Sequence, residues 1–293
     1  MILVIGATGA LGSEICRLLA ERGDTVRALV RPSSDPARVE RLREMGVETI
    51  VGDLKDPETL APACEGASVV ISTASTTHSR QPDDSIPRVD RDGQIAAVDA
   101  ARDADVGQFI YISYSGNIDV DCPLHSAKRE VELHLHASGM EYTILRPSVF
   151  MEVWLSPALG FDARQGAARI FGAGNQPVSW ISAADVARFA VDCVGAPAAM
   201  RRVIELGGPE ALTPLEVVRT FEELGGHPIA REHISEEALD AQWRHATDPL
   251  EKSFAALMLG ISHGDPIDMT ATLQAFPRRL TSVREYAARV LQS

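Results

Sequence analysis

The chain has 293 residues, 45% of them hydrophobic, and carries a formal net charge of −13. That apolar content suffices for a large α/β domain with a smaller appendage and excludes a disordered chain. The negative charge argues against binding a nucleic-acid backbone over a broad surface. No leader precedes the first apolar run, and no run of about 18 apolar residues is present, so we expect a cytoplasmic protein without a membrane partner.

The cysteines are widely separated, with no CxxC pair and no histidine at metal-ligand spacing. They are Cys16, Cys64, Cys122 and Cys193. We therefore expect reduced thiols and no metal site.

The N-terminal segment has the pattern of a nucleotide phosphate site. An apolar run at 2–5 is followed by Gly6, Gly9 and Gly12, and apolar residues then recur at helical period until Gly23. Gly6 permits a sharp exit from the strand, Gly9 lets a diphosphate approach the backbone, and Gly12 brings helix and strand together, while first-turn amides face the anion. An ordinary strand–turn–helix connection is the alternative, but the flanking context favours a dinucleotide. The predicted phosphate-binding residues are Gly6, Thr8, Gly9, Ala10, Leu11 and Gly12.

Arg31 closes a second apolar run, at 25–30, where an NAD-type fold would carry an acidic residue for the adenosine ribose. Its guanidinium and the hydroxyl groups of Ser33 and Ser34 suit a ribose 2′-phosphate. The alternative is a solvent-facing arginine at a strand end. The sequence therefore favours NADP(H) over NAD(H).

Apolar strand runs alternate with helical patterns along the first half of the chain, which predicts an α/β fold with a Rossmann-type doubly wound parallel sheet. The later predicted strands are 47–51, 68–74, 108–114 and 141–146. A loop-rich stretch then precedes a helix near Ala183, a strand at 203–206 and a helix beginning at Thr213–Pro214.

The predicted division is an NAD(P)-binding domain over 1–150, to which 178–206 returns. A smaller substrate lobe is expected from 151–177 and 207–293.

Several motifs together resemble the NmrA-like branch of the atypical short-chain dehydrogenases. They are GATGALG, Arg31-Pro32-Ser33, Gly52-Asp53-Leu54, the strand end 110–113, SGMEYTILRP over 138–147, and Asp185-Val186-Ala187. The resemblance covers nearly the whole chain. It implies an NAD(P)-binding domain with a variable C-terminal lobe, in a family of NADPH reductases of quinones, dyes and plant phenylpropanoids that also holds cofactor-sensing regulators without catalysis.

The resemblance also implies further cofactor contacts at the carboxyl ends of strands, where open parallel sheets bind ligands. Asp53 and Leu54 match positions that flank adenine, although Asp53 equally suits a helix N-cap or Asx turn. The other residues expected beside the cofactor are Thr73, Ala74, Ser75, Lys128, Pro147 and Phe150.

The catalytic pattern departs from ordinary short-chain dehydrogenases, which carry a Tyr-x-x-x-Lys pair. Lys128 is present, but Leu124 stands where the tyrosine would be. The resemblance places Lys128 beside the nicotinamide ribose, where it would position the cofactor and relay or supply a proton. The alternative is a solvated helical lysine paired with Glu132.

Three other residues are candidate substitutes for the tyrosine. Ser113 stands where the family carries an active-site Ser or Thr, and could hydrogen-bond a substrate carbonyl. Tyr114 follows it and is a candidate donor, as is His125, three residues before Lys128. Isolated residues of this kind are more often structural.

Other conspicuous residues have both a structural and a functional interpretation. Asp185 is expected to stabilise helix N-terminal amides. The segment 76–87, with His78 and Arg80, has the length of a flap over the site. The apolar residues after the sixth strand suit either a pocket over the nicotinamide or core packing; they are Phe150, Met151, Trp154, Leu155 and Phe161.

The sequence therefore favours an NADPH-dependent reductase of a small apolar or aromatic carbonyl, quinone or enone. A non-catalytic NADP(H) sensor that signals through a protein partner is the competing class, supported by Leu124. An epimerase or dehydratase is disfavoured, because it too would want the tyrosine. We expect a small-molecule substrate and no direct nucleic-acid partner; the oligomeric state, a homodimer included, stays open.

Overall fold

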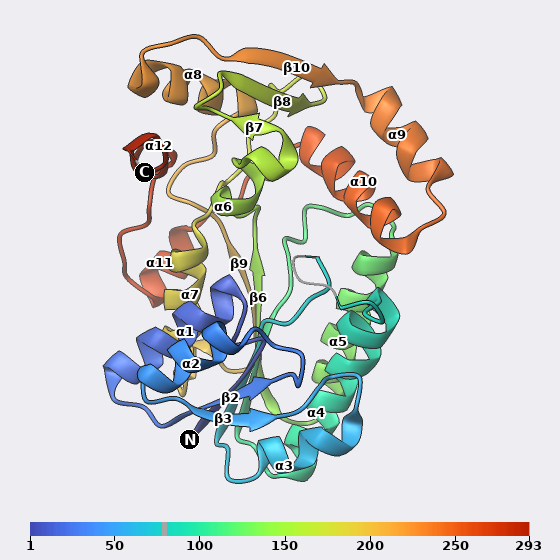
Figure 1. Cartoon of the computed structure of the whole chain (residues 1–293), viewed down its shortest axis with the longest axis vertical. Helices are drawn as coiled ribbons and strands as arrows, with labels where there is room; N and C mark the ends of the chain where they lie inside the picture. The colour runs from blue at the N-terminus through green and yellow to red at the C-terminus, as the bar shows by residue number, and fades with distance from the viewer. Residues whose placement is uncertain (78–80, 293) are drawn as a thin grey trace. The chain divides into compact units, whose positions relative to one another are not determined.

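The computed structural model describes residues 1–77 and 81–292 (Figure 1). Its main sheet has seven strands in the order β3-β2-β1-β4-β5-β6-β9. The pairings among β1 to β6 are parallel. The strands are β1 Ile2–Ile5, β2 Val26–Val30, β3 Glu48–Val51, β4 Val69–Ser72, β5 Gln108–Ile112, β6 Glu141–Pro147 and β9 Arg202–Leu206. This order confirms the predicted Rossmann-type α/β fold.

The register of the central strands brings their carboxyl ends to one edge of the sheet. Ile5, the last residue of β1, lies opposite Leu29 of β2 and Ser72 of β4. Every residue of β1 and β4 is buried, as expected of parallel strands with both faces covered. The chain segments that leave β1, β2 and β4 therefore begin at the same edge.

Two predicted strands are shorter than expected. The runs at 68–74 and 108–114 end at Ser72 and Ile112. The amides of Thr73 and Ser113 still bond to neighbouring strands, as does that of Ser115 to Pro147 of β6, but these residues are not part of a strand. Residues expected inside strands thus lie in loops at the carboxyl edge.

Contacts divide the chain into two compact units. Unit 1 comprises 1–113, 126–145 and 186–204. Its core contains Leu3, Ile5, Phe109, Tyr111 and Ile144. Its helices, some of which extend into unit 2, are α1 Ala10–Arg22, α2 Pro36–Glu44, α3 Leu60–Cys64, the π-helix Ile86–Gly93, α4 Gln94–Asp103, α5 Pro123–Ala137 and α7 Ala183–Asp192, with short 3₁₀ turns at Pro57–Thr59 and Pro197–Ala199.

Unit 2 comprises 114–125, 146–185 and 205–293. Residues 114–125, 146–150, 178–185 and 205–206, expected in the dinucleotide-binding domain, group with this unit. Its small sheet has the order β10-β8-β7 and packs over a separate core. Its elements are α6 Met151–Trp154, a 3₁₀ turn Pro157–Leu159, β7 Phe161–Asp162, β8 Ala167–Phe171, α8 Pro214–Gly225, β10 Ala230–Ile234, α9 Glu236–His245, α10 Pro249–Ser262, α11 Thr270–Ala275 and α12 Val283–Gln292.

Helix boundaries agree with the local signals in the sequence. α1 ends at Gly23, whose positive φ of 87° is the left-handed conformation that glycine adopts without strain. α8 begins at Thr213, which forms a reciprocal capping box with Glu216. None of the helices in the described part of the chain has the length and apolar composition needed to cross a bilayer.

Candidate functional site

The turn after β1 is shaped by two glycines that the fold itself requires. Gly6 has φ of 84°, and a Cβ there would lie 2.6 Å from Thr73 Oγ1. A Cβ on Gly12 would overlap the carbonyl of Gly6, because α1 packs directly on the turn. The roles expected of these two glycines are thus present as backbone geometry.

Gly9 is different, because little within the protein requires a glycine there. Its backbone is extended, with φ of −78° and ψ of 165°, and an added Cβ would have one close neighbour, the Gly6 carbonyl oxygen at 3.2 Å. No side chain caps α1, and its first turn carries no acidic residue. Since Ala10 and Leu11 begin this helix, their first-turn amides have no side-chain cap competing for them.

Arg31 follows β2 and belongs to a charged cluster. Its Nη1 lies 2.8 Å from Asp84 Oδ2, and Lys55 Nζ lies 2.6 Å from the other oxygen of that carboxylate. The Asp84 side chain is buried, whereas Arg31 is partly exposed. The Arg31 amide donates to Ser34 Oγ at 3.0 Å, while Ser33 is exposed in the turn. Arg31 is therefore held in place rather than extended freely into solvent.

Sequence reasoning missed two basic residues near this cluster. Lys55 is one, and Arg38 is the other; the exposed Arg38 donates from Nη1 to the carbonyl of Thr8 at 3.2 Å. Asp35 caps α2 and so places Arg38 in its first turn, beside the glycine turn. The only signal for Arg38 in the sequence was its position as a basic residue shortly after Arg31.

The residues predicted to flank adenine have local structural roles. Asp53 Oδ1 accepts from the Lys55 amide at 3.0 Å, which forms the Asx turn that was the alternative interpretation, and Leu54 is buried.

The residues expected beside the cofactor after β4 also make local hydrogen bonds. Thr73 Oγ1 donates to the Ile5 carbonyl at 3.2 Å. Gln94 Nε2 donates to the Ala74 carbonyl at 2.9 Å, and the Ser75 hydroxyl lies 3.2 Å from that of Thr77.

Lys128 is buried on α5, with 5% of its surface exposed, so the alternative of a solvated lysine is wrong. Its Nζ donates to the Ile112 carbonyl at 3.2 Å, at the carboxyl end of β5, and lies 4.9 Å from the centre of the Tyr111 ring. Burial lowers the pKa of Lys128, against the opposing effects of Asp90 and Glu132.

Asp90, on the π-helix, is a second residue that sequence reasoning missed. Its side chain is fully buried, and its Oδ1 lies 4.0 Å from Lys128 Nζ. Its Oδ2 accepts from the amide and hydroxyl of Thr76. No periodicity or motif marks this contact, because the two residues are far apart in the chain.

Ser113 receives a hydrogen bond from the residue after Lys128. Arg129 Nη1 lies 3.2 Å from Ser113 Oγ and 2.6 Å from Glu132 Oε1. Glu132, offered in the sequence as a partner of Lys128, is thus paired with Arg129. Because the guanidinium can only donate, the Ser113 hydroxyl hydrogen is left to donate elsewhere.

The remaining candidates belong to unit 2. The Tyr114 ring packs 6.2 Å from that of His125, and the Tyr114 hydroxyl oxygen is buried. His125 Nε2 lies 3.2 Å from Asp119 Oδ1. The Pro147 carbonyl accepts from the Ser115 amide at 2.9 Å. Phe150 caps α6 by its backbone and is partly exposed.

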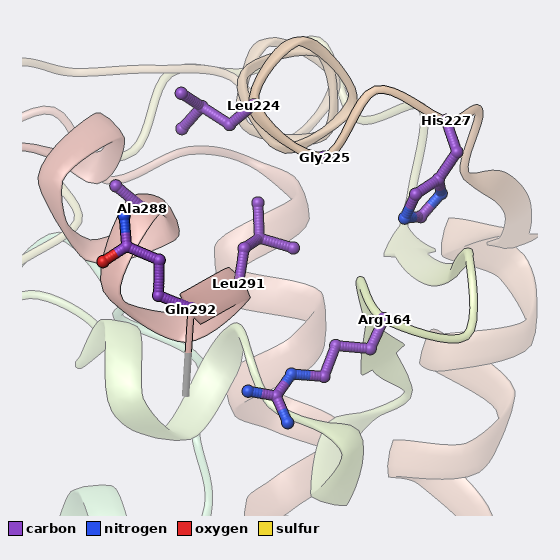
Figure 2. A pocket seen from close by; sticks show the side chains of 7 residues that line it. All are labelled: Arg164, Leu224, Gly225, His227, Ala288, Leu291 and Gln292. Carbon is purple, nitrogen blue, oxygen red and sulfur yellow. The ribbon is translucent and has the colours of Figure 1, made fainter.

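Four of the five apolar residues expected either in a pocket or in the core are packed in the core of unit 2, and the partly exposed Phe150 is the exception. Met151, Leu155 and Phe161 are buried there, and Trp154 packs against them. The hollow beside Trp154 holds only about 20 Å³. A larger, shallower cavity of about 390 Å³ lies elsewhere in unit 2 (Figure 2). It is lined by Arg164, Leu224, Gly225, His227, Ala288, Leu291 and Gln292.

Asp185 and part of the expected flap, 76–77 and 81–87, lie within the described residues. Asp185 Oδ2 accepts from the Thr281 amide at 2.8 Å, while Glu152 binds the first amide of α7, at Ala183. His78 and Arg80 of the expected flap lie outside the described residues. Within 81–87, Asp84 anchors the segment to Arg31.

The cysteines are buried and unpaired, and burial raises the pKa of Cys16 to about 12. Across 1–77 and 81–292, histidine, cysteine and acidic side chains form no cluster that could hold a metal ion.

The family model of the NmrA-like family matches residues 1–287. The photosystem II assembly factor Ycf39 of Trieres chinensis is 32% identical over 77% of this chain and 69% of its own length. An NAD(P)H azoreductase of Xenophilus azovorans is 32% identical over 78% of this chain and 75% of its own.

A solved structure shares the fold: the NADPH-dependent quinone oxidoreductase QOR2 of Escherichia coli, complexed with NADPH. It has a TM-score of 0.81 and 23% identity, and the match covers 99% of each chain. With the family model matching nearly every residue, the chain belongs to the NmrA-like family.

Proposed function

We propose that the protein is an NADPH-dependent reductase that transfers a hydride to a small apolar or aromatic carbonyl, quinone or enone. The observation that carries this proposal is the buried Lys128, held by the Ile112 carbonyl at the end of β5 and faced by the Asp90 carboxylate. A buried ammonium is costly, and such groups are concentrated at sites where a proton is moved. The azoreductase among the relatives supports the same reaction class.

The residues around the glycine turn fit a dinucleotide. Gly9 leaves open the space that a Cβ would occupy, and the uncapped start of α1 suits a diphosphate. Arg31, oriented by Asp84, and the exposed Arg38 supply positive charge for a 2′-phosphate. We therefore assign NADP(H) in preference to NAD(H).

The bound cofactor would supply the hydride for the substrate carbon. Lys128 then donates a proton to the oxygen that becomes negative, and a solvent proton restores its ammonium form. Ser113 would donate a hydrogen bond to the same oxygen, because its own acceptor side is held by Arg129. The carbon gains a hydride and the oxygen a proton, so the carbonyl is reduced to an alcohol.

A specific observation favours the second candidate, a cofactor-binding regulator without catalysis. Leu124 is buried in the position of the missing tyrosine, and relatives include assembly factors. Such a protein would bind NADPH through the same turn but would not consume it.

The test is NADPH consumption by the purified protein with a panel of quinones, enones, azo dyes and aromatic aldehydes, monitored by nicotinamide absorbance. We expect turnover with at least one class and tighter binding of NADPH than of NADH. Tight NADPH binding without turnover on any panel member would support the regulator instead.

A further inference from the structure

Asp90 is a buried acid that the proposed reaction does not yet use. It lies on the π-helix Ile86–Gly93, and its side chain is fully buried. Thr76 binds one carboxylate oxygen twice, from its hydroxyl at 2.6 Å and from its amide at 3.2 Å. Burying a carboxylate is unfavourable unless its charge is compensated, so a partner is needed on the other oxygen.

That other oxygen, Oδ1, has no hydrogen-bond partner within the described residues. The cation facing it is Lys128, whose Nζ lies 4.0 Å away. Within 1–77 and 81–292, the hydrogen-bond acceptor of Lys128 Nζ is the Ile112 carbonyl alone. An ammonium has three donor hydrogens, so this arrangement leaves donors for a substrate or cofactor.

We propose that Asp90 is a positioning residue for Lys128: its carboxylate, held by Thr76, keeps the buried Lys128 side chain protonated. The role deepens the proposed reductase function and rests on it. Asp90 acts through Lys128, because its own oxygens are occupied by Thr76 or face the ammonium.

Other charged and aromatic groups around Lys128 come from its own helix, α5, and from β5. Glu132 and Arg129 lie on α5 and pair with each other at 2.6 Å. Tyr111 on β5 presents its ring to the ammonium. Because the Glu132 charge is largely matched by Arg129, Asp90 is the principal counter-charge.

The sign of the expected effect follows from the charge. Burial lowers the pKa of Lys128, and Asp90 opposes that shift. An Asp90→Asn variant keeps an oxygen for Thr76 but loses the charge, so the pKa of Lys128 falls further. We expect a decrease of at least about one pH unit, a tenfold change in the proton equilibrium. If protonated Lys128 is the acid, the alkaline limb of turnover moves to lower pH by the same amount.

The experiment exploits the scarcity of lysine, which occurs only at positions 55, 128 and 252. Nitrogen-15 labelling of lysine gives resolvable Nζ signals in the full-length protein, assigned with Lys55→Arg and Lys252→Arg. The Lys128 signal is titrated in wild type, Asp90→Asn and Thr76→Val. The matched control is Asp99→Asn, a partly exposed acid on the adjoining α4 that pairs with Arg102 and with His134.

We expect Asp90→Asn to shift the Lys128 titration most, Thr76→Val to shift it in the same direction by less, and Asp99→Asn to leave it unchanged. An unchanged titration in folded Asp90→Asn overturns the proposal. If Asp90→Asn does not fold, an unchanged Lys128 titration in Thr76→Val overturns the proposal instead. Failure of the reductase proposal is seen separately, as NADPH binding without turnover in wild type.

Discussion

The glycine turn and the neighbourhood of Lys128 belong to the same unit but are built in different ways. The turn uses the backbone of one short segment, from Gly6 to Gly12, and its geometry follows from glycine spacing. The Lys128 neighbourhood joins Thr76, Asp90 and Ile112 from three separate segments. The first offers amides to an anion, and the second holds a charge away from water. Binding and chemistry are therefore expected to fail separately when each is altered.

The largest effect on cofactor binding is expected at Gly9. Gly9→Val places a branched side chain where the diphosphate must approach, and we expect NADPH affinity to fall by about 100-fold or more, ~2.8 kcal/mol, while the protein stays folded. Calorimetric titration measures the affinity, and thermal unfolding measures the stability. Gly107→Val is the matched control, because a Cβ there also has one close neighbour, the Ser68 carbonyl at 3.3 Å. Normal NADPH binding by Gly9→Val would make the turn a purely structural connection.

Lys128→Met tests the proposed role of the Lys128 neighbourhood in the chemical step. The apolar replacement fills the buried space but removes the proton, so turnover should fall by about 10²–10⁴-fold, with a smaller loss of NADPH affinity. Steady-state kinetics and calorimetry separate the two effects. Lys252→Met, where the ammonium lies 5.8 Å from the Trp243 ring, is the control. Unchanged turnover in Lys128→Met would move the acid role to Tyr114 or His125, tested with Tyr114→Phe and His125→Ala.

Arg31 tests how the cofactor-binding region distinguishes NADPH from NADH. Arg31→Ala should remove at least about tenfold, ~1.4 kcal/mol, of the preference for NADPH over NADH, because the 2′-phosphate loses its guanidinium. Calorimetry with both cofactors measures it. Arg38→Ala should have a smaller effect on this preference. Arg38 is exposed, and no buried acid among the described residues holds it in place as Asp84 holds Arg31. If wild type binds the two cofactors equally, the assignment of Arg31 is wrong.

The smallest effect is expected on stability at Leu124. Leu124 is 3% exposed, so Leu124→Tyr overpacks its surroundings and should lower the free energy of unfolding by about 1–3 kcal/mol without preventing folding. Urea unfolding measures it. Leu133→Tyr on the same helix is the control, because Leu133 is 68% exposed. Equal stability of the two variants would contradict the packing around Leu124.

The same contrast explains how far the sequence could predict the molecule. Strand and helix positions follow from local periodicity and caps, so β1, Gly23 and Thr213 lie where their patterns indicated. Contacts between distant segments leave no such pattern, and Asp90 and Asp84 were therefore missed. The sequence left open whether Phe161 lines a pocket or packs in the core. It packs in the core of unit 2, and this depends on which residues surround it rather than on composition.

The measurement that tests the central claim most directly is transfer of deuterium from NADPH labelled at the transferable position of its nicotinamide. The label is followed by mass spectrometry of the product, with an enone or aromatic aldehyde that supports NADPH consumption, because the hydride there forms a carbon–deuterium bond that does not exchange with water. We predict one deuterium in each product molecule and loss of this transfer in Lys128→Met. NADPH that binds tightly but is consumed with no substrate class, and yields no labelled product with enones or aldehydes, would contradict the reductase and leave the cofactor-binding regulator.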